Sequence, residues 1–139
     1  MATKSEAYVD TSALIAFADG SDTFHPLFCR LFASPPALVT TPLVIAEGHG
    51  WFLRRYDSYR ALQFIAMVEA MTPLRILAVG PKLQKAAHDQ LRRFSDQRLT
   101  LVDAVGIELM QQRGTPRCWS TDRHLGLGGA SLVIHEHGR

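Results

Sequence analysis

Four acidic side chains stand where carboxylates could hold a metal ion. Asp10 and Asp122 each follow directly on a short apolar run that predicts a strand, and open α/β sheets bind ligands at the carboxyl ends of their strands. Asp103 lies at the start of a predicted helix. Glu47 lies within an apolar helical run, where a buried carboxylate is unfavourable unless a partner compensates its charge.

If these four carboxylates lie together they repel one another, and a hard divalent cation removes that repulsion. Mg²⁺ prefers oxygen ligands in octahedral geometry and keeps several waters, which leaves room for a phosphate. Such an ion could lower the pKa of an attacking water and neutralise charge that develops on the phosphate. A pocket formed by these four acids would therefore suit Mg²⁺ and a phosphate ligand.

Spacing alone leaves a structural role open for each acid, because long segments separate them and no compact motif joins them. Asp10 or Asp122 could cap a turn or a short helix, and Asp103 could be only the acid of a capping box. Glu47 could reach solvent by its own length. His124 could contact phosphate or donate a proton, although a lone histidine in a turn more often packs or faces solvent.

The elements that must position these residues alternate between short strands and helices, which is typical of parallel strands joined by helical crossovers. Strands are expected at residues 7–9, 37–40, 75–79, 117–120 and 131–134. Helices are expected from residue 13, over 24–32, from 42, from 57 or 58 to 72, over 82–93, and from 101 to about 114. The predicted fold class is α/β, a three-layer α/β/α sandwich around a central, mostly parallel sheet of about five strands.

Local signals mark where some of these helices begin. Thr11 or Ser12 is expected to cap the first helix. Thr41 precedes a proline, which predicts an N-cap followed by proline at the first helical position. Thr100 and Asp103 have the spacing of a capping box, with Asp in place of the usual Glu or Gln. The histidine-containing end, residues 135–137, is interpreted as a frayed tail.

Length and composition predict one folded domain, residues 1–139. Hydrophobic residues make up 47% of the chain and charged residues 20%, which is too apolar for a disordered protein. No run is long and apolar enough for a membrane span, and the N-terminus lacks a signal-peptide core, so we expect a cytoplasmic protein without membrane association. Cys29 and Cys118 lie far apart and are expected to be buried thiols.

The formal net charge is +2, and setting the four acids aside leaves +6 on the rest of the chain. Of the 15 basic residues 12 are Arg, including the pairs Arg54/Arg55 and Arg92/Arg93. The guanidinium fork suits phosphate oxygens. A nucleic-acid partner is one interpretation, and Arg-rich codon usage with ordinary solvated helix faces is the other.

Four local strings, read together and in order, give the chain a family resemblance. They are YVDTSAL at residues 8–14, IAE at 45–47, LTLVDA at 99–104 and STDRHL at 120–125. The chain resembles the PIN-domain family, and in particular the VapC-type toxins of bacterial toxin–antitoxin pairs, from residue 7 to about 134. It departs from the family at Thr100, where Ser is more frequent, and at Leu125, where an aromatic residue is common.

The resemblance implies a metal-dependent ribonuclease that cleaves single-stranded RNA, with Mg²⁺ or Mn²⁺ as cofactor. It implies the four acids named above as metal ligands, the hydroxyls of Thr11, Ser12 and Thr121 as supporting or substrate-side groups, and Asp96 as a weaker candidate. It also implies a homodimer and a small antitoxin whose apolar segment packs near the active site. The apolar helix at residues 24–32 is a candidate surface for such a contact.

Three other functions compete with the toxin. A stand-alone RNA-processing PIN nuclease would have the same sequence features, and a neighbouring gene for a DNA-binding antitoxin would distinguish the two. A non-catalytic PIN-like module that binds RNA or protein would lack one or more of the acids, and all four are present. A haloacid-dehalogenase-like phosphotransferase needs an acid two residues after Asp10, where this chain has Ser12.

Overall fold

The centre of the protein is a five-stranded sheet in which every neighbouring pair of strands is parallel. The computed structural model describes residues 6–137. The strands are β1 (Ala7–Val9), β2 (Leu38–Thr40), β3 (Leu74–Ile76), β4 (Arg117–Trp119) and β5 (Ser131–Leu132), in the order β3-β2-β1-β4-β5. Because β1 lies between β2 and β4, the residues that follow β1 and β4 meet at one edge of the sheet.

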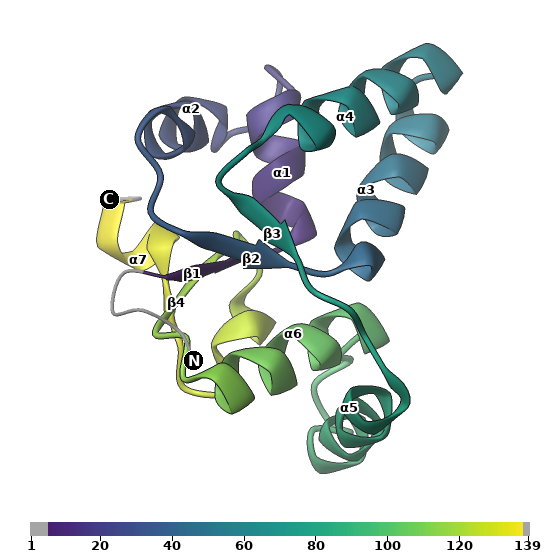
Figure 1. The fold of residues 1–139 in the computed structure, drawn as a ribbon, viewed down its shortest axis with the longest axis vertical. Helices are drawn as coiled ribbons and strands as arrows, with labels where there is room; N and C mark the ends of the chain where they lie inside the picture. The colour runs from purple at the N-terminus through teal and green to yellow at the C-terminus, as the bar shows by residue number, and fades with distance from the viewer. Residues whose placement is uncertain (1–5, 138–139) are drawn as a thin grey trace.

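Helices cover both faces of the sheet, which confirms the predicted three-layer α/β class (Figure 1). On one face lie α1 (Thr11–Ala18), α2 (His25–Ala33), α3 (Pro42–Arg55) and α4 (Ser58–Ala70). On the other lie α5 (Pro81–Arg93) and α6 (Leu101–Arg113), packed against each other. A short 3₁₀ helix, η1 (Arg123–Gly126), follows β4, and α7 (Val133–His137) ends the described chain.

The core forms where the strands meet the helical layer of α1 to α4. Phe28, Phe52 and Phe64 are almost completely buried there, and each such side chain stabilises the fold by about 1.5–3 kcal/mol relative to exposure. The ring of Phe32 on α2 lies edge-on to Trp119 on β4, with the centroids 4.9 Å apart. Most of the apolar stripe predicted for residues 24–32 is thus part of the core, so little of it is free for a partner.

The first helix begins two residues earlier than the sequence predicted. The N-cap position is Asp10, and neither Thr11 nor Ser12 caps the helix, because both lie in its first turn. The Ser12 hydroxyl is instead hydrogen-bonded to the Asp10 carboxylate. Thr41 does precede α3 as expected, but its hydroxyl makes no capping bond. The capping box of Thr100 and Asp103 is confirmed at the start of α6.

The C-terminal segment also differs from the prediction. A strand was expected over residues 131–134, but β5 has two residues and α7 begins at Val133. β5 is an edge strand that pairs with β4 only at Ser131 and Leu132, and the β-branched Val133 is buried by a helical turn instead. Residues 135–137 therefore belong to a helix and not to a frayed tail, and Glu136 lies 3.7 Å from the Arg117 guanidinium.

The remaining differences are small. The third strand is limited to Leu74–Ile76, shorter than the predicted 75–79. Cys118 is buried as expected, whereas Cys29 is only half-buried, and both are free thiols. Among the helices within residues 6–137, none has the length and apolar character that a membrane crossing requires.

Candidate metal centre

The pairing of β1 with β4 brings the first and fourth candidate acids to the same edge of the sheet. Val9 is in register with Trp119, and the Asp10 amide continues the ladder by donating to the Trp119 carbonyl at 3.0 Å. Asp10 and Asp122 therefore leave neighbouring strand ends. α6 begins beside them and carries Asp103 in its first turn, and Glu47 stands in the second turn of α3.

Asp10 is the most deeply buried of the four acids, with 4% of its surface exposed. Burial raises its pKa to about 6, and the negative charge of Asp103 acts in the same direction. Hydrogen bonds from Ser12 and Ser120 partly offset this rise. The site therefore contains a carboxylate whose ionised form the protein alone stabilises incompletely, which is the situation that a bound cation corrects.

Two serines hold the Asp10 carboxylate, one in α1 and one directly after β4. The hydroxyls of Ser12 and Ser120 donate to the same oxygen, Oδ2, at 2.9 and 3.0 Å, and lie 3.1 Å from each other. Each hydroxyl also accepts a backbone amide of the segment after β4: Thr121 N–H donates to Ser12 and Asp122 N–H donates to Ser120. The serines thus fix Asp10 relative to the chain that carries Asp122.

Asp103 is 6% exposed and is fixed by its capping box. Its amide donates to Thr100 Oγ1 at 3.1 Å, and its Oδ2 accepts the Thr100 amide at 3.3 Å. Burial raises the pKa of Asp103, the bonds from Thr100 oppose that rise, and the charges of Asp122 and Glu47 add to it. Asp103 is therefore close enough to each of the other three acids to interact with it electrostatically.

The tightest group of possible metal ligands is formed by Asp103, Asp122 and His124. One ligand atom from each lies within 4.8 Å of the others. Asp122 and His124 are half-buried, and His124 Nδ1 is 3.0 Å from Asp122 Oδ1. Glu47 is also half-buried. The cost of burying an uncompensated carboxylate is therefore larger for Asp10 than for Glu47.

The weaker candidates separate into two groups. Ser12 touches Asp10, and Thr121 contributes its backbone amide to the serine bridge. Thr11 Oγ1 is buried with no hydrogen-bond partner in the described part of the chain. Asp96 is exposed in the loop between α5 and α6, and no hydrogen bond joins it to another described residue. Of these four residues, Ser12 is the one whose side chain is hydrogen-bonded to a candidate acid within the described part of the chain.

Sequence reasoning missed Ser120, which is completely buried and contacts both Asp10 and the Asp122 amide. Its partner Asp10 is 110 residues away, so only the adjacency of β1 and β4 reveals the contact. The sequence did contain one signal for Ser120, because this residue directly follows the apolar strand that precedes Asp122.

The donor set fits a hard divalent cation. It offers carboxylate oxygens from four elements, two of them on acids whose pKa is raised by burial and by neighbouring charge. The Thr11 hydroxyl beside Asp10 is a buried polar atom without a described partner. Oxygen donors of this kind suit Mg²⁺ and Mn²⁺, and these residues would hold such an ion.

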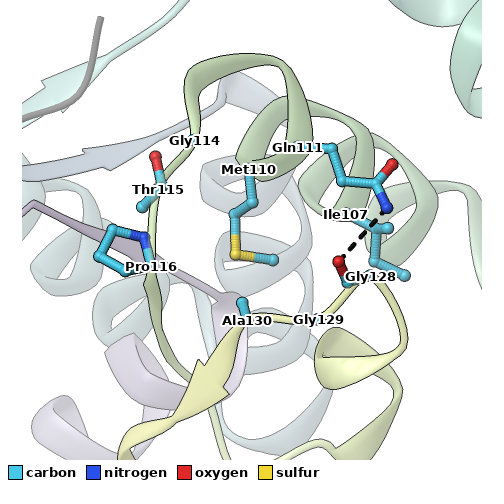
Figure 2. A pocket seen from close by; sticks show the side chains of 9 residues that line it. All are labelled: Ile107, Met110, Gln111, Gly114, Thr115, Pro116, Gly128, Gly129 and Ala130. Carbon is cyan, nitrogen blue, oxygen red and sulfur yellow. Dashed lines mark hydrogen bonds between the residues drawn. The ribbon is translucent and has the colours of Figure 1, made fainter.

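A cavity lies at the opposite end of the sheet (Figure 2). It has a volume of about 350 Å³ and is lined by residues that precede β4 and β5 and by the end of α6: Ile107, Met110, Gln111, Gly114, Thr115, Pro116, Gly128, Gly129 and Ala130. Gln111 Nε2 donates to the Gly128 carbonyl across it at 3.4 Å. With no acid, histidine or cysteine in its lining, this cavity is not the metal centre.

Comparison with known proteins agrees with this geometry. The sequence model of the PIN domain matches residues 7–126, which include all four acids. The chain belongs to the PIN-domain family. It is 29% identical over 124 residues to proteins named 23S rRNA-specific endonuclease VapC20 from two strains of Mycobacterium tuberculosis. The match covers 88% of this chain and 93% of those relatives.

The solved structures include a similar protein. The crystal structure of Mycobacterium tuberculosis VapC20, described as a toxin that cleaves the sarcin–ricin loop, superposes with a TM-score of 0.81 at 26% identity. The match covers 89% of this PIN domain chain and 95% of that structure. The predicted family resemblance and fold class are therefore both confirmed.

Proposed function

We propose that this protein is a metal-dependent endoribonuclease and the toxin of a toxin–antitoxin pair. The observation that carries the proposal is that Asp103 on α6 interacts electrostatically with Asp10, at the end of β1, and has a ligand atom within 4.8 Å of one on Asp122, after β4, in a chain of the PIN-domain family. VapC20, the relative that matches by both sequence and structure, is named as an endonuclease and as a toxin.

The residues of this chain have separable parts in the proposed reaction. Asp10, Glu47, Asp103 and Asp122 would hold Mg²⁺ or Mn²⁺, which when bound activates water and neutralises charge on the scissile phosphate. Ser12 and Ser120 fix the position of Asp10. Thr100 fixes Asp103, and the hydroxyls of Thr11 and Thr121 are proposed as substrate-side groups.

An RNA substrate follows from the family and from the charge. Outside the four acids the chain carries a net charge of +6, which favours association with a polyanion. Because the relatives are named for cleavage of 23S rRNA and of the sarcin–ricin loop, an RNA with that loop is the first substrate to test. Cleavage of such an RNA would take place in the cytoplasm.

A small antitoxin is the proposed protein partner, and an open apolar groove of about 500 Å³ is a better surface for it than α2. The groove is lined by residues of α3, α4 and β3: Pro42, Ile45, Ala46, His49, Ile65 and Ile76. Because Ala46 adjoins Glu47 in sequence, an apolar segment in the groove could bring a basic side chain to the acids. A homodimer is proposed as well, and light scattering would test it.

Cleavage assays test the enzymatic proposal directly. Purified protein should cut a single-stranded RNA that contains the sarcin–ricin loop sequence when Mg²⁺ or Mn²⁺ is present and should stop in excess chelator, because carboxylates alone do not activate water near neutral pH. Asp10→Asn, purified identically, should be inactive, which excludes a contaminating nuclease. Cleavage that persists in chelator would contradict the proposal.

Expression in cells separates the toxin from a processing enzyme. Growth arrest by the wild type and none by Asp10→Asn would support the toxin. Normal growth together with metal-dependent cleavage in vitro would favour a stand-alone RNA-processing nuclease. Metal-dependent association with RNA without cleavage would favour a non-catalytic binding module.

A further inference from the structure

His124 stands among the acids although the four proposed ligands are all carboxylates. Its side chain is 36% exposed, and it belongs to η1, directly after Asp122 and Arg123. Its Nδ1 lies 3.0 Å from Asp122 Oδ1, and Asp103 completes the group within 4.8 Å. This imidazole has no part in the mechanism proposed above.

The local backbone fixes His124 in this place. Its amide donates to Asp122 Oδ1 at 2.9 Å, and its carbonyl accepts the Leu127 amide at 3.1 Å. The next residue, Leu125, is completely buried and anchors the turn in the core. The imidazole therefore lies on a turn that is hydrogen-bonded and packed against the core.

The distances suit ligands that share one ion. Adjacent ligands of an octahedral ion with bonds of about 2.1 Å are about 3 Å apart, and opposite ligands about 4.2 Å apart. His124 Nδ1 and Asp122 Oδ1, 3.0 Å apart, have the separation of adjacent ligands, and a ligand atom of Asp103 lies within 4.8 Å of a ligand atom of each of them. Without a cation, the same contact is an ion pair when the imidazole is protonated.

We propose that His124 is a nitrogen ligand of the metal centre, together with Asp103 and Asp122, and that it shifts the preference of the site from Mg²⁺ toward Mn²⁺. The inference rests on the proposed function, because it takes the acids to be a metal centre. Imidazole is a good ligand for transition metals, whereas Mg²⁺ is bound mainly through oxygen. A site of carboxylates alone would lack this source of discrimination.

Metal binding to the full-length protein tests the assignment without reference to cleavage. His124→Asn retains an amide that can donate to Asp122 but removes the imidazole nitrogen. Titration calorimetry should show Mn²⁺ affinity falling about tenfold or more and Mg²⁺ affinity changing much less, so that the ratio of the two affinities falls. His88→Asn, an exposed histidine on α5, should bind both ions as the wild type does.

Pulsed electron paramagnetic resonance of bound Mn²⁺ gives an independent readout. The wild type and His88→Asn should show modulation from a coordinated ¹⁴N nucleus, and His124→Asn should lose it. Absence of the ¹⁴N modulation in the wild type would overturn the proposal, even if His124→Asn failed to fold. Equal losses of Mg²⁺ and Mn²⁺ affinity in His124→Asn would also overturn it, because the histidine would then only orient Asp122. Failure of the wild type to bind either ion would instead refute the metal centre and the proposed function.

Discussion

At the scale of single residues, burial gives the four acids different properties. Asp10 is enclosed and its pKa is raised to about 6, first by burial and also by the charge of Asp103. In the unfolded chain the same carboxyl titrates near its ordinary value of about 3.9. Near neutral pH the metal-free fold therefore holds an ionised group that would be more stable in water, and Asp10 opposes folding.

This difference predicts how the stability of the metal-free protein depends on pH. Between about pH 6 and pH 4 the folded state binds a proton at Asp10 that the unfolded state releases, so Asp10 opposes folding less as the pH falls through this range and more as it rises. The two pKa values differ by an amount worth about 3 kcal/mol. Asp10→Asn lacks the titrating group and should be more stable than the wild type at pH 7 by up to that amount.

Urea unfolding in chelator at several pH values measures the effect as the difference between the two proteins. The advantage of Asp10→Asn should shrink as the pH is lowered from 7 to 4.5. Because Glu6 and Asp19 have lowered pKa values and titrate in both proteins, only the difference is informative. Parallel stability profiles for the two proteins would show that Asp10 does not titrate in this range.

At the scale of elements, the position of Asp103 depends on how closely α6 approaches β1. Gly106, one turn after Asp103, faces the ring of Tyr8 on β1. A Cβ at Gly106 would come within 2.8 Å of Tyr8 Cε1 and 3.0 Å of its hydroxyl oxygen, and Tyr8 is completely buried. Because Gly106 has no side chain, α6 packs closer to β1 than a larger residue would allow.

Gly106→Ala should destabilise the protein although alanine is the better helix former. Alanine improves helix propensity by about 1 kcal/mol, but overpacking a rigid core contact costs about 1–3 kcal/mol, and Tyr8 has no space to yield. We expect a lower urea midpoint and reduced cleavage, because Asp103 moves with α6. Gly20→Ala, where a Cβ meets nothing within 4 Å, is the control and should change neither. A more stable Gly106→Ala protein would contradict this packing argument.

The sequence predicts these elements well where the signal is local. The capping box fixes the start of α6 because both partners lie within four residues, and the proline after Thr41 places Glu47 in the second turn of α3. The start of α1 was predicted wrongly because Asp10, Thr11 and Ser12 all have side chains that cap helices, and their tertiary contacts decide among them.

Contacts between distant segments could not be predicted from one sequence. The role of Ser120 depends on the pairing of β1 with β4, and the grouping of His124 with Asp103 depends on the approach of η1 to α6. The helical start at Val133 was missed because β-branched residues favour strands, whereas edge-strand pairing ends at Leu132. The acids could be predicted individually, but the bridges that hold them could not.

At the scale of the whole molecule, folding gathers four negative charges at one edge of a sheet in a chain whose net charge is +2. Burial raises the pKa values of Asp10 and Asp103, and repulsion by the neighbouring acids adds to the rise. A cation that binds only the folded state lowers the free energy of that state by mass action. Stability and metal binding should therefore be linked, and the linkage should depend on each acid that binds the ion.

Thermal and urea unfolding with and without Mg²⁺ measure this linkage. Mg²⁺ at one hundred times its Kd should stabilise the wild type by about 2.7 kcal/mol. Asp10→Asn should gain much less, because one charged ligand is gone, although without metal it should be at least as stable as the wild type.

Asp89→Asn is the matched control, since Asp89 is exposed on α5 in surface ion pairs with Lys85 and Arg92 that contribute little. It should keep the full metal response and full cleavage. If Mg²⁺ stabilised Asp10→Asn as much as the wild type, Asp10 would not be a ligand, and if that variant cleaved RNA at the wild-type rate, the proposed mechanism would be wrong.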